Sequence, residues 1–254
     1  MGNASTVILQ CRDQVATLTL NDASRHNALG HAELGQLGDA LDTIAGDASL
    51  RAVLLTGAGE KTFCAGAALD QLDGVHFDGD TFAPVTDKLA ALPLPTVCAL
   101  NGNVFGAGVD LALACDFRLG VVGSRMRVPA AVLGACYPPG CVQRMVAQLG
   151  VAASRRLLLM AETLDADAML ACGFLQWQVA REQLHARAQL LLDQLLALAP
   201  KSLSAMKSMI GLSAVGLNDA QAAQELMSDC FASEDFSEGM AAQREARAPK
   251  FSGN

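Results

Sequence analysis

The sequence predicts an α/β fold with a parallel sheet, followed by a helical C-terminal region. Short apolar runs typical of buried strands alternate with helical patterns over the first half of the chain. Short Gly-rich links join them, as in α/β proteins with parallel strands. After about residue 142 the pattern becomes mostly helical. A chain of 254 residues suits one large domain, or a domain with a small appendage.

The N-terminal elements follow from their periodicity. The segment VATLTLN (15–21) alternates between apolar and polar residues, which indicates a strand. The segment 31–47 has apolar residues at helical spacing, although Gly35 and Gly38 weaken the pattern. LRAVLLTGAG (50–59) is a short apolar run ending in glycines, which is typical of a buried parallel strand.

The later elements are expected in the same way. Segment 95–122 predicts a strand, a Gly-rich turn, a helix that starts near Gly106, and a second strand. Segments 141–162, 181–200 and 202–233 predict helices. The Asp-rich segment Asp70–Lys88 predicts a solvated loop, or alternatively a lid over a pocket.

Charge and composition exclude several classes of function. The formal charge of −8 argues against a nucleic-acid partner, because a phosphate backbone needs a basic face. The uncharged run Leu89–Val109 contains Pro93 and Pro95, so it predicts a strand, turn and helix rather than a membrane span. The cysteines lie mostly in apolar runs, which suits reduced thiols in the cytoplasm. Cys136 and Cys141 have no histidine beside them, so we expect no metal site.

Two Gly-rich turns are the candidate functional features. FCAGAAL (63–69) and NGNVFGAGVDLALACD (101–116) place small residues where a strand passes into a loop or helix. Such turns let the backbone approach a ligand and leave N–H groups without partners. Two converging N–H groups form an oxyanion hole, which stabilises negative charge on a carbonyl oxygen. Tight packing of helix on strand is the structural alternative. Neither turn matches a dinucleotide fingerprint.

These two turns together resemble the crotonase superfamily, the enoyl-CoA hydratase/isomerase family. SRHNAL (24–29), VPAAVLG (128–134) and the C-terminal segment 233–254 support the resemblance over nearly the whole chain. It implies a spiral core of ββα units over residues 1–195 and a helical trimerisation region over 196–254, so we expect a homotrimer or hexamer. It also implies an acyl-CoA substrate, or an acyl group on a carrier protein, with no cofactor besides the CoA of the substrate.

The resemblance also implies roles for particular residues. The oxyanion-hole amides would be those of Ala67 and Ala107. Substrate and CoA contacts are expected from six further positions, with Arg25 facing the CoA phosphates: Arg25, Ala65, Gly66, Gly106, Ala130 and Leu133.

The reaction is where the sequence departs from the family. Hydratases of this family use two glutamates, which would fall at positions 110 and 130, but the chain has Asp110 and Ala130. An aspartate is one methylene shorter, and alanine transfers no proton. The two-carboxylate addition of water is therefore in doubt.

Two residues remain as candidate catalytic groups. Asp110 has no cationic neighbour in its motif, so we expect an unpaired carboxylate suited to proton transfer; an Asp stabilised by the helix dipole is the alternative. GACYPPG (134–140) resembles a loop of methylmalonyl-CoA decarboxylase, in which a tyrosine faces the substrate carboxylate. Tyr137 would then donate a proton, although it could equally be a packing residue. Three functions stay open: a hydratase or isomerase, a decarboxylase of a malonyl-type acyl-CoA, and a non-catalytic acyl-CoA binder.

Overall fold

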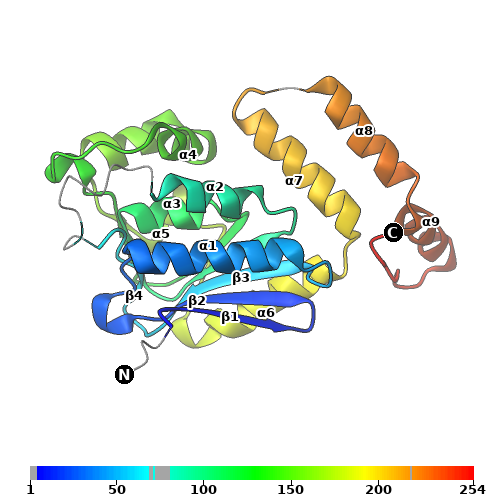
Figure 1. The fold of residues 1–254 in the computed structure, drawn as a ribbon, viewed down its shortest axis with the longest axis horizontal. Coiled ribbons are helices and arrows are strands. Elements are labelled where there is room, and N and C mark those ends of the chain that lie inside the picture. The colour runs from blue at the N-terminus through cyan, green and yellow to red at the C-terminus, as the bar shows by residue number, and fades with distance from the viewer. Residues whose placement is uncertain (1–4, 69–70, 72–80, 218) are drawn as a thin grey trace.

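The computed structural model describes residues 5–68, 71, 81–217 and 219–254, and within them the chain forms two sheets covered by helices (Figure 1). The larger sheet has the order β1 (Val7–Arg12), β2 (Val15–Leu20), β3 (Ala52–Gly57), β5 (Thr96–Leu100), β7 (Phe117–Val121) and β10 (Trp177–Val179). The smaller has the order β4 (Thr62–Cys64), β6 (Asn103–Phe105), β8 (Arg125–Arg127) and β9 (Leu164–Asp165). All pairings are parallel except β1 with β2 and β8 with β9. The predicted α/β class with a parallel sheet is confirmed.

The helices of the described residues lie on both faces of the larger sheet and beyond it. They are α1 (His31–Gly46), α2 (Ala83–Ala91), α3 (Ala107–Leu113), α4 (Pro139–Leu159), α5 (Ala166–Ala171), α6 (Leu184–Leu196), α7 (Pro200–Ala214), α8 (Ala220–Phe231) and α9 (Glu234–Glu245). The described residues also form the short 3-10 helices η1 (Ala23–Arg25), η3 (Ala130–Val132) and η4 (Arg181–Gln183).

One core lies between the larger sheet and α1 to α4. Helix α1 begins after Gly30, whose N–H donates to the Glu33 side chain at 2.9 Å, and it buries Leu34, Leu37, Leu41 and Ile44. Their spacing of three or four residues puts them on one face of the helix. They join β2, β3 and β5 in the main hydrophobic cluster. Helix α6 closes a second cluster on the opposite face of the sheet.

The C-terminal helices stand away from the sheet. Figure 1 shows α7 and α8 side by side, with α9 and the C-terminus beyond them. Lys207 of α7 donates to the carbonyl of Leu94 and to Asp116, both at 2.8 Å, and so ties this helix to the core. Many apolar side chains on α7 to α9 remain exposed, and they include Met206, Ile210, Met227, Phe231, Phe236 and Met240. The domain boundary expected near residue 196 falls between α6, which packs on the sheet, and α7, but it stays a prediction.

Several sequence-based expectations need correction. Helix α2 begins at Ala83, so the end of the expected loop Asp70–Lys88 is helical, with Pro84 in its first turn, where a missing N–H costs nothing. Residues 70 and 72–80 of that loop, and with them the expected lid, lie outside the described residues. The mostly helical region expected after residue 142 contains β9 and β10, and β10 extends the larger sheet. Helix α4 also breaks at Gly150, where φ is 75°.

The cysteines of the described residues differ in their exposure. Cys64, Cys98, Cys115 and Cys141 are buried and unpaired, whereas Cys11 and Cys136 are exposed. No helix within the described ranges is long and apolar enough to cross a membrane.

Candidate functional site

The two Gly-rich turns lie against each other. Strands β4 and β6 are parallel neighbours, so the turns that follow them leave the sheet at the same edge. Gly66 has φ +87°, and a β-carbon there would stand 2.7 Å from the carbonyl oxygen of Phe105 and 2.9 Å from the amide nitrogen of Ala107. Only glycine fits this approach, because both contacts are backbone atoms.

The backbone hydrogen bonds of the described residues around these turns do not use the N–H groups of Ala67 and Ala107. The N–H of Leu29 donates to Gly66 at 2.8 Å, and the N–H of Ala68 donates to Leu29 at 2.9 Å, which pairs Leu29 with Ala67 as a parallel bridge. Gly106 donates to Arg127 at 2.9 Å. Within the described part of the chain, neither Ala67 nor Ala107 donates a backbone bond in these turns. Ala107 opens α3, where a helix has no partner for its N–H.

A cleft of about 570 Å³ lies beside these turns. Ala65 and Phe105 bring the two turns to its wall, and Gly123 and Ser124 close another side. Its basic lining residues are His26, Lys61 and Arg181. Arg181 donates to the carbonyl oxygens of Glu60 and Asn101, which fixes its guanidinium at the wall.

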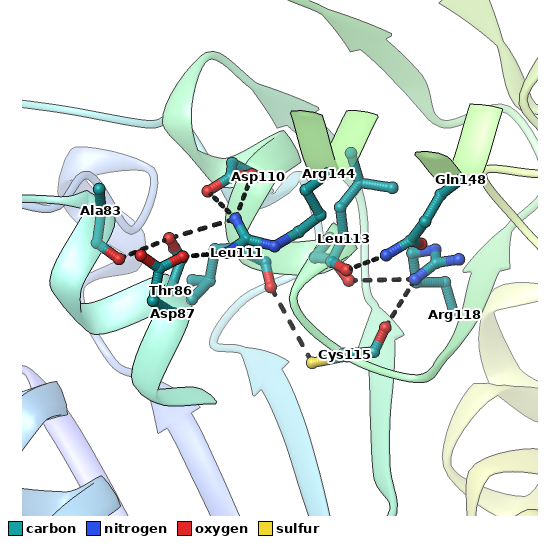
Figure 2. Close-up of polar contacts among 11 residues, drawn as sticks. Ala83, Thr86, Asp87, Asp110, Leu111, Leu113, Cys115, Arg118, Arg144 and Gln148 are labelled. Atoms are coloured by element: carbon teal, nitrogen blue, oxygen red, sulfur yellow. Dashed lines mark hydrogen bonds and ion pairs between the residues drawn. The ribbon is translucent and has the colours of Figure 1, made fainter. Parts of the chain in front are cut away.

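Asp110 lies in the first turn of α3 and forms a buried ion pair with Arg144 of α4. One nitrogen of the guanidinium, Nη1, lies 2.6 and 2.7 Å from the two carboxylate oxygens (Figure 2). Asp110 is 1% exposed and Arg144 is 12% exposed. The expectation that Asp110 has no cationic neighbour is therefore wrong. Arg144 is 34 residues further along the chain, and only the packing of α4 on α3 brings it there.

Arg144 has a second carboxylate partner on α2. Its Nη2 donates to Asp87, which is 60% exposed, and Nη1 lies 3.4 Å from the hydroxyl of Thr86. Gln148, one turn after Arg144, donates to the carbonyl of Leu113 at 2.7 Å (Figure 2). Burial acts to lower the pKa of Arg144, but the charges of Asp110 and Asp87 raise it above its usual value. Arg144 therefore stays cationic and joins three helices.

Tyr137 has a buried hydroxyl beside this ion pair. Its oxygen has no hydrogen-bond partner among the described residues. Burial, followed by the charge of Asp110, raises the pKa of Tyr137 well above its usual value. Burial and the charge of Asp110 also raise the pKa of Cys141 to about 12, and burial raises that of Cys64 to about 12. Tyr137, Cys141 and Asp110 thus lie close together, and the phenol keeps its proton.

The other expected site residues are spread around these groups. Ala130 is buried at the start of η3, which approaches Gly106 through Pro129. Leu133 directly follows η3 and is 56% exposed. Arg25 ends η1, directly before the cleft residue His26.

The sequence did not reveal Arg144 or Cys141 as neighbours of Asp110, nor Asp87 as the second partner of Arg144. Arg144 lies in a segment whose sequence predicts only a helix, and the direction of its side chain depends on how α4 packs on α3. Among the described residues, no group of three or more His, Cys, Asp or Glu side chains could hold a metal ion.

Known proteins resemble this chain over nearly its whole length. The family model described as enoyl-CoA hydratase/isomerase matches residues 10–254. A short-chain-enoyl-CoA hydratase of Clostridium acetobutylicum is 29% identical over 250 residues, which cover 96% of each chain. A 2,3-dehydroadipyl-CoA hydratase of Escherichia coli K12 is 30% identical over 254 residues, or 98% of this chain and 99% of that protein. The crystal structure of an enoyl-CoA hydratase from Bacillus anthracis superposes with a TM-score of 0.92 at 25% identity, covering 98% of this chain and 100% of the other.

Proposed function

The chain belongs to the enoyl-CoA hydratase/isomerase family, and from this premise we propose that it binds an acyl-CoA thioester and stabilises the enolate of its acyl group. The observation that supports this most is the contact of Gly66 with the amide of Ala107. This contact brings the two turns together, and we infer that the amides of Ala67 and Ala107 would bind one thioester oxygen between them. Charge that grows on this oxygen would then be stabilised by fixed donors.

The cleft beside the turns fits the CoA part of the substrate. Lys61 and His26 offer positive or hydrogen-bonding groups near the turns, and Arg25 precedes His26 in the chain. Phosphate oxygens are suited to such donors. The acyl group would then extend from the two amides toward Asp110 and Tyr137.

Enolate formation can be tested without knowing the final product. Butyryl-CoA incubated with the protein in D₂O should lose its α-proton signal by NMR, because each enolate picks up deuterium on return. Gly66→Ala should abolish this exchange, and Gly35→Ala is the matched control, since no described atom beyond the backbone of its own helix lies within 4 Å of the new β-carbon. If butyryl-CoA keeps its α-proton but still raises the melting temperature of the protein, the chain binds acyl-CoA without forming the enolate.

The addition of water by two carboxylates is not supported, because position 130 is an alanine. Decarboxylation of a malonyl-type acyl-CoA is the second candidate, and the unpartnered buried hydroxyl of Tyr137 favours it. Loss of CO₂ generates the enolate directly, so only one proton donor is then needed. Mass spectrometry of methylmalonyl-CoA reactions tests this, since in Tyr137→Phe the enolate left by the loss of CO₂ would lack its proton donor and most of the propionyl-CoA formation should be lost. Full activity of the Phe variant would exclude Tyr137 as donor.

The exposed apolar side chains of α7 to α9 suit a homo-oligomer, a trimer or hexamer. Burial of Ile210, Phe231 and Met240 against a second copy would remove apolar surface from water. Light scattering coupled to size exclusion should give three or six chains for the wild type. A Phe231→Asp, Ile210→Asp double variant should give a smaller particle.

A further inference from the structure

On the proposed function, the acyl group would end at the buried ion pair of Asp110 on α3 and Arg144 on α4. Nη1 of Arg144 donates to both carboxylate oxygens of Asp110, at 2.6 and 2.7 Å (Figure 2). Because both oxygens are held by this one nitrogen, the carboxylate has little freedom to rotate. The arginine fork spans two carboxylates, with Nη1 on Asp110 and Nη2 on Asp87, and a single ammonium cannot hold both in these fixed directions. The direction of Asp110 is thus set from α4 and not by its own helix.

Arg144 is itself fixed by groups outside the site. Asp87 accepts from its other terminal nitrogen, and Thr86 lies beside Nη1. Gln148, on the same face of α4, holds the C-terminal end of α3 through the carbonyl of Leu113. The two contacts from α4, one to the first turn of α3 and one to its end, fix the register between the helices.

We propose that Arg144 is a positioning residue of the site, which holds the carboxylate of Asp110 toward the acyl group and away from the hydroxyl of Tyr137. This inference rests on the proposed function. Among the described residues the phenol has no hydrogen-bond partner, and this supports the proposal, because a freely turning carboxylate nearby would accept a hydrogen bond from that hydroxyl. Arg144 acts through Asp110 and does not itself contact the substrate.

The role predicts a loss in kcat with little change in KM. Displacement of a reacting group by 1 Å costs about a hundredfold in rate, so Arg144→Met should lower kcat for α-proton exchange by about that factor. KM for butyryl-CoA should change less than about threefold, because binding depends on the cleft and the amides. Arg144→Lys keeps the charge without the fork and should recover kcat to within about tenfold of the wild type.

The same helix provides the control. Arg156 of α4 bonds Glu162 twice at 2.7 Å, but both side chains are partly exposed and lie outside the site. Arg156→Met should leave kcat and KM unchanged. Equal kcat for wild type and Arg144→Met would overturn the proposal. If the Met variant does not fold, Arg144→Lys decides, because a Lys variant with wild-type kcat shows that the fork does not set the direction of Asp110.

A spectroscopic test separates this inference from the proposed function. Tyr137 is the only tyrosine of the chain, so tyrosine labelled with ¹³C at Cζ gives one NMR resonance. In Arg144→Met the released carboxylate should accept a hydrogen bond from Tyr137 and move this resonance, whereas Arg156→Met should not. If the wild type acts on no acyl-CoA, the proposed function fails, and the resonance alone decides the role of Arg144. An unmoved resonance in Arg144→Met overturns it.

Discussion

The α-carbon of Gly66 packs against the amide of Ala107, and this contact joins the two turns that contain the proposed oxyanion hole. A β-carbon at position 66 would lie 2.9 Å from that nitrogen and 2.7 Å from the carbonyl of Phe105, and φ at Gly66 is +87°. The turns can meet only while residue 66 has no side chain.

Gly66→Ala should therefore separate the turns and destabilise the fold. The positive φ alone costs an alanine about 1–2 kcal/mol, and the two backbone contacts add to this. Urea unfolding should show the loss, while Gly35→Ala, in the interior of α1, should be neutral or slightly stabilising. A Gly66→Ala protein with wild-type stability and full α-proton exchange would contradict the contact.

Alkaline pH should weaken the fold through Tyr137. Burial, and after it the charge of Asp110, raise the pKa of this phenol above its ordinary 10.0 in the native state. The native state therefore keeps a proton that the unfolded chain loses. This contribution is complete below pH 10 and declines as pH rises from there toward the native pKa.

The single tyrosine makes this measurable. The tyrosinate absorbance of the native protein should appear only as circular dichroism reports unfolding, whereas the urea-unfolded chain should titrate near pH 10. The stability of Tyr137→Phe should fall less steeply above pH 10. Ionisation of the phenol near its ordinary pKa, in protein that is still folded, would show that the hydroxyl reaches solvent.

Much of the fold follows from the sequence, because long elements have a clear period. The buried strand β3 and helix α1 are examples, since six or more residues display a continuous apolar run or helical spacing. Strands β6 and β10 have three residues each, which is too short for any pattern. The contact of Asp110 with Arg144 joins residues 34 apart, and no local spacing encodes it.

A glutamate in place of Ala130 should supply the second carboxylate that the two-carboxylate addition of water requires. Ala130 begins η3 and is buried beside the turn at Gly106, so a longer side chain there would face the same region as the family's second carboxylate. A positioned general acid or base contributes about 10²–10⁴-fold, so Ala130→Glu should raise the hydration of crotonyl-CoA at least tenfold. Loss of the conjugated thioester absorbance measures it.

Ala131→Glu is the matched control for that gain, because residue 131 is the exposed neighbour in the same 3-10 helix. It should leave hydration at the wild-type level. Equal rates for the two glutamate variants would show that position 130 does not face the acyl group.

The ion pair of Lys207 with Asp116 should determine how firmly α7 is held to the core. Lys207 is 14% exposed, and it donates to Asp116 and to the carbonyl of Leu94 at 2.8 Å. The same oxygen of Asp116 accepts hydrogen bonds from the N–H and the hydroxyl of Thr96 at 2.7 and 2.8 Å. These bonds hold the carboxylate in place independently of the lysine. Because hydrogen bonds to charged groups contribute about 1.5–3 kcal/mol, Lys207→Met should lower the free energy of unfolding by about 2 kcal/mol.

The exposed Lys201 on the same helix provides the comparison, and Lys201→Met should change stability by less than about 0.5 kcal/mol. Hydrogen exchange should locate the effect: amides of α7 should exchange faster in Lys207→Met, while those of β3 and β5 keep their protection. Uniform acceleration across the sheet would mean that α7 and the core unfold as one unit. Unchanged exchange in α7 would mean that its apolar contacts hold it without the ion pair.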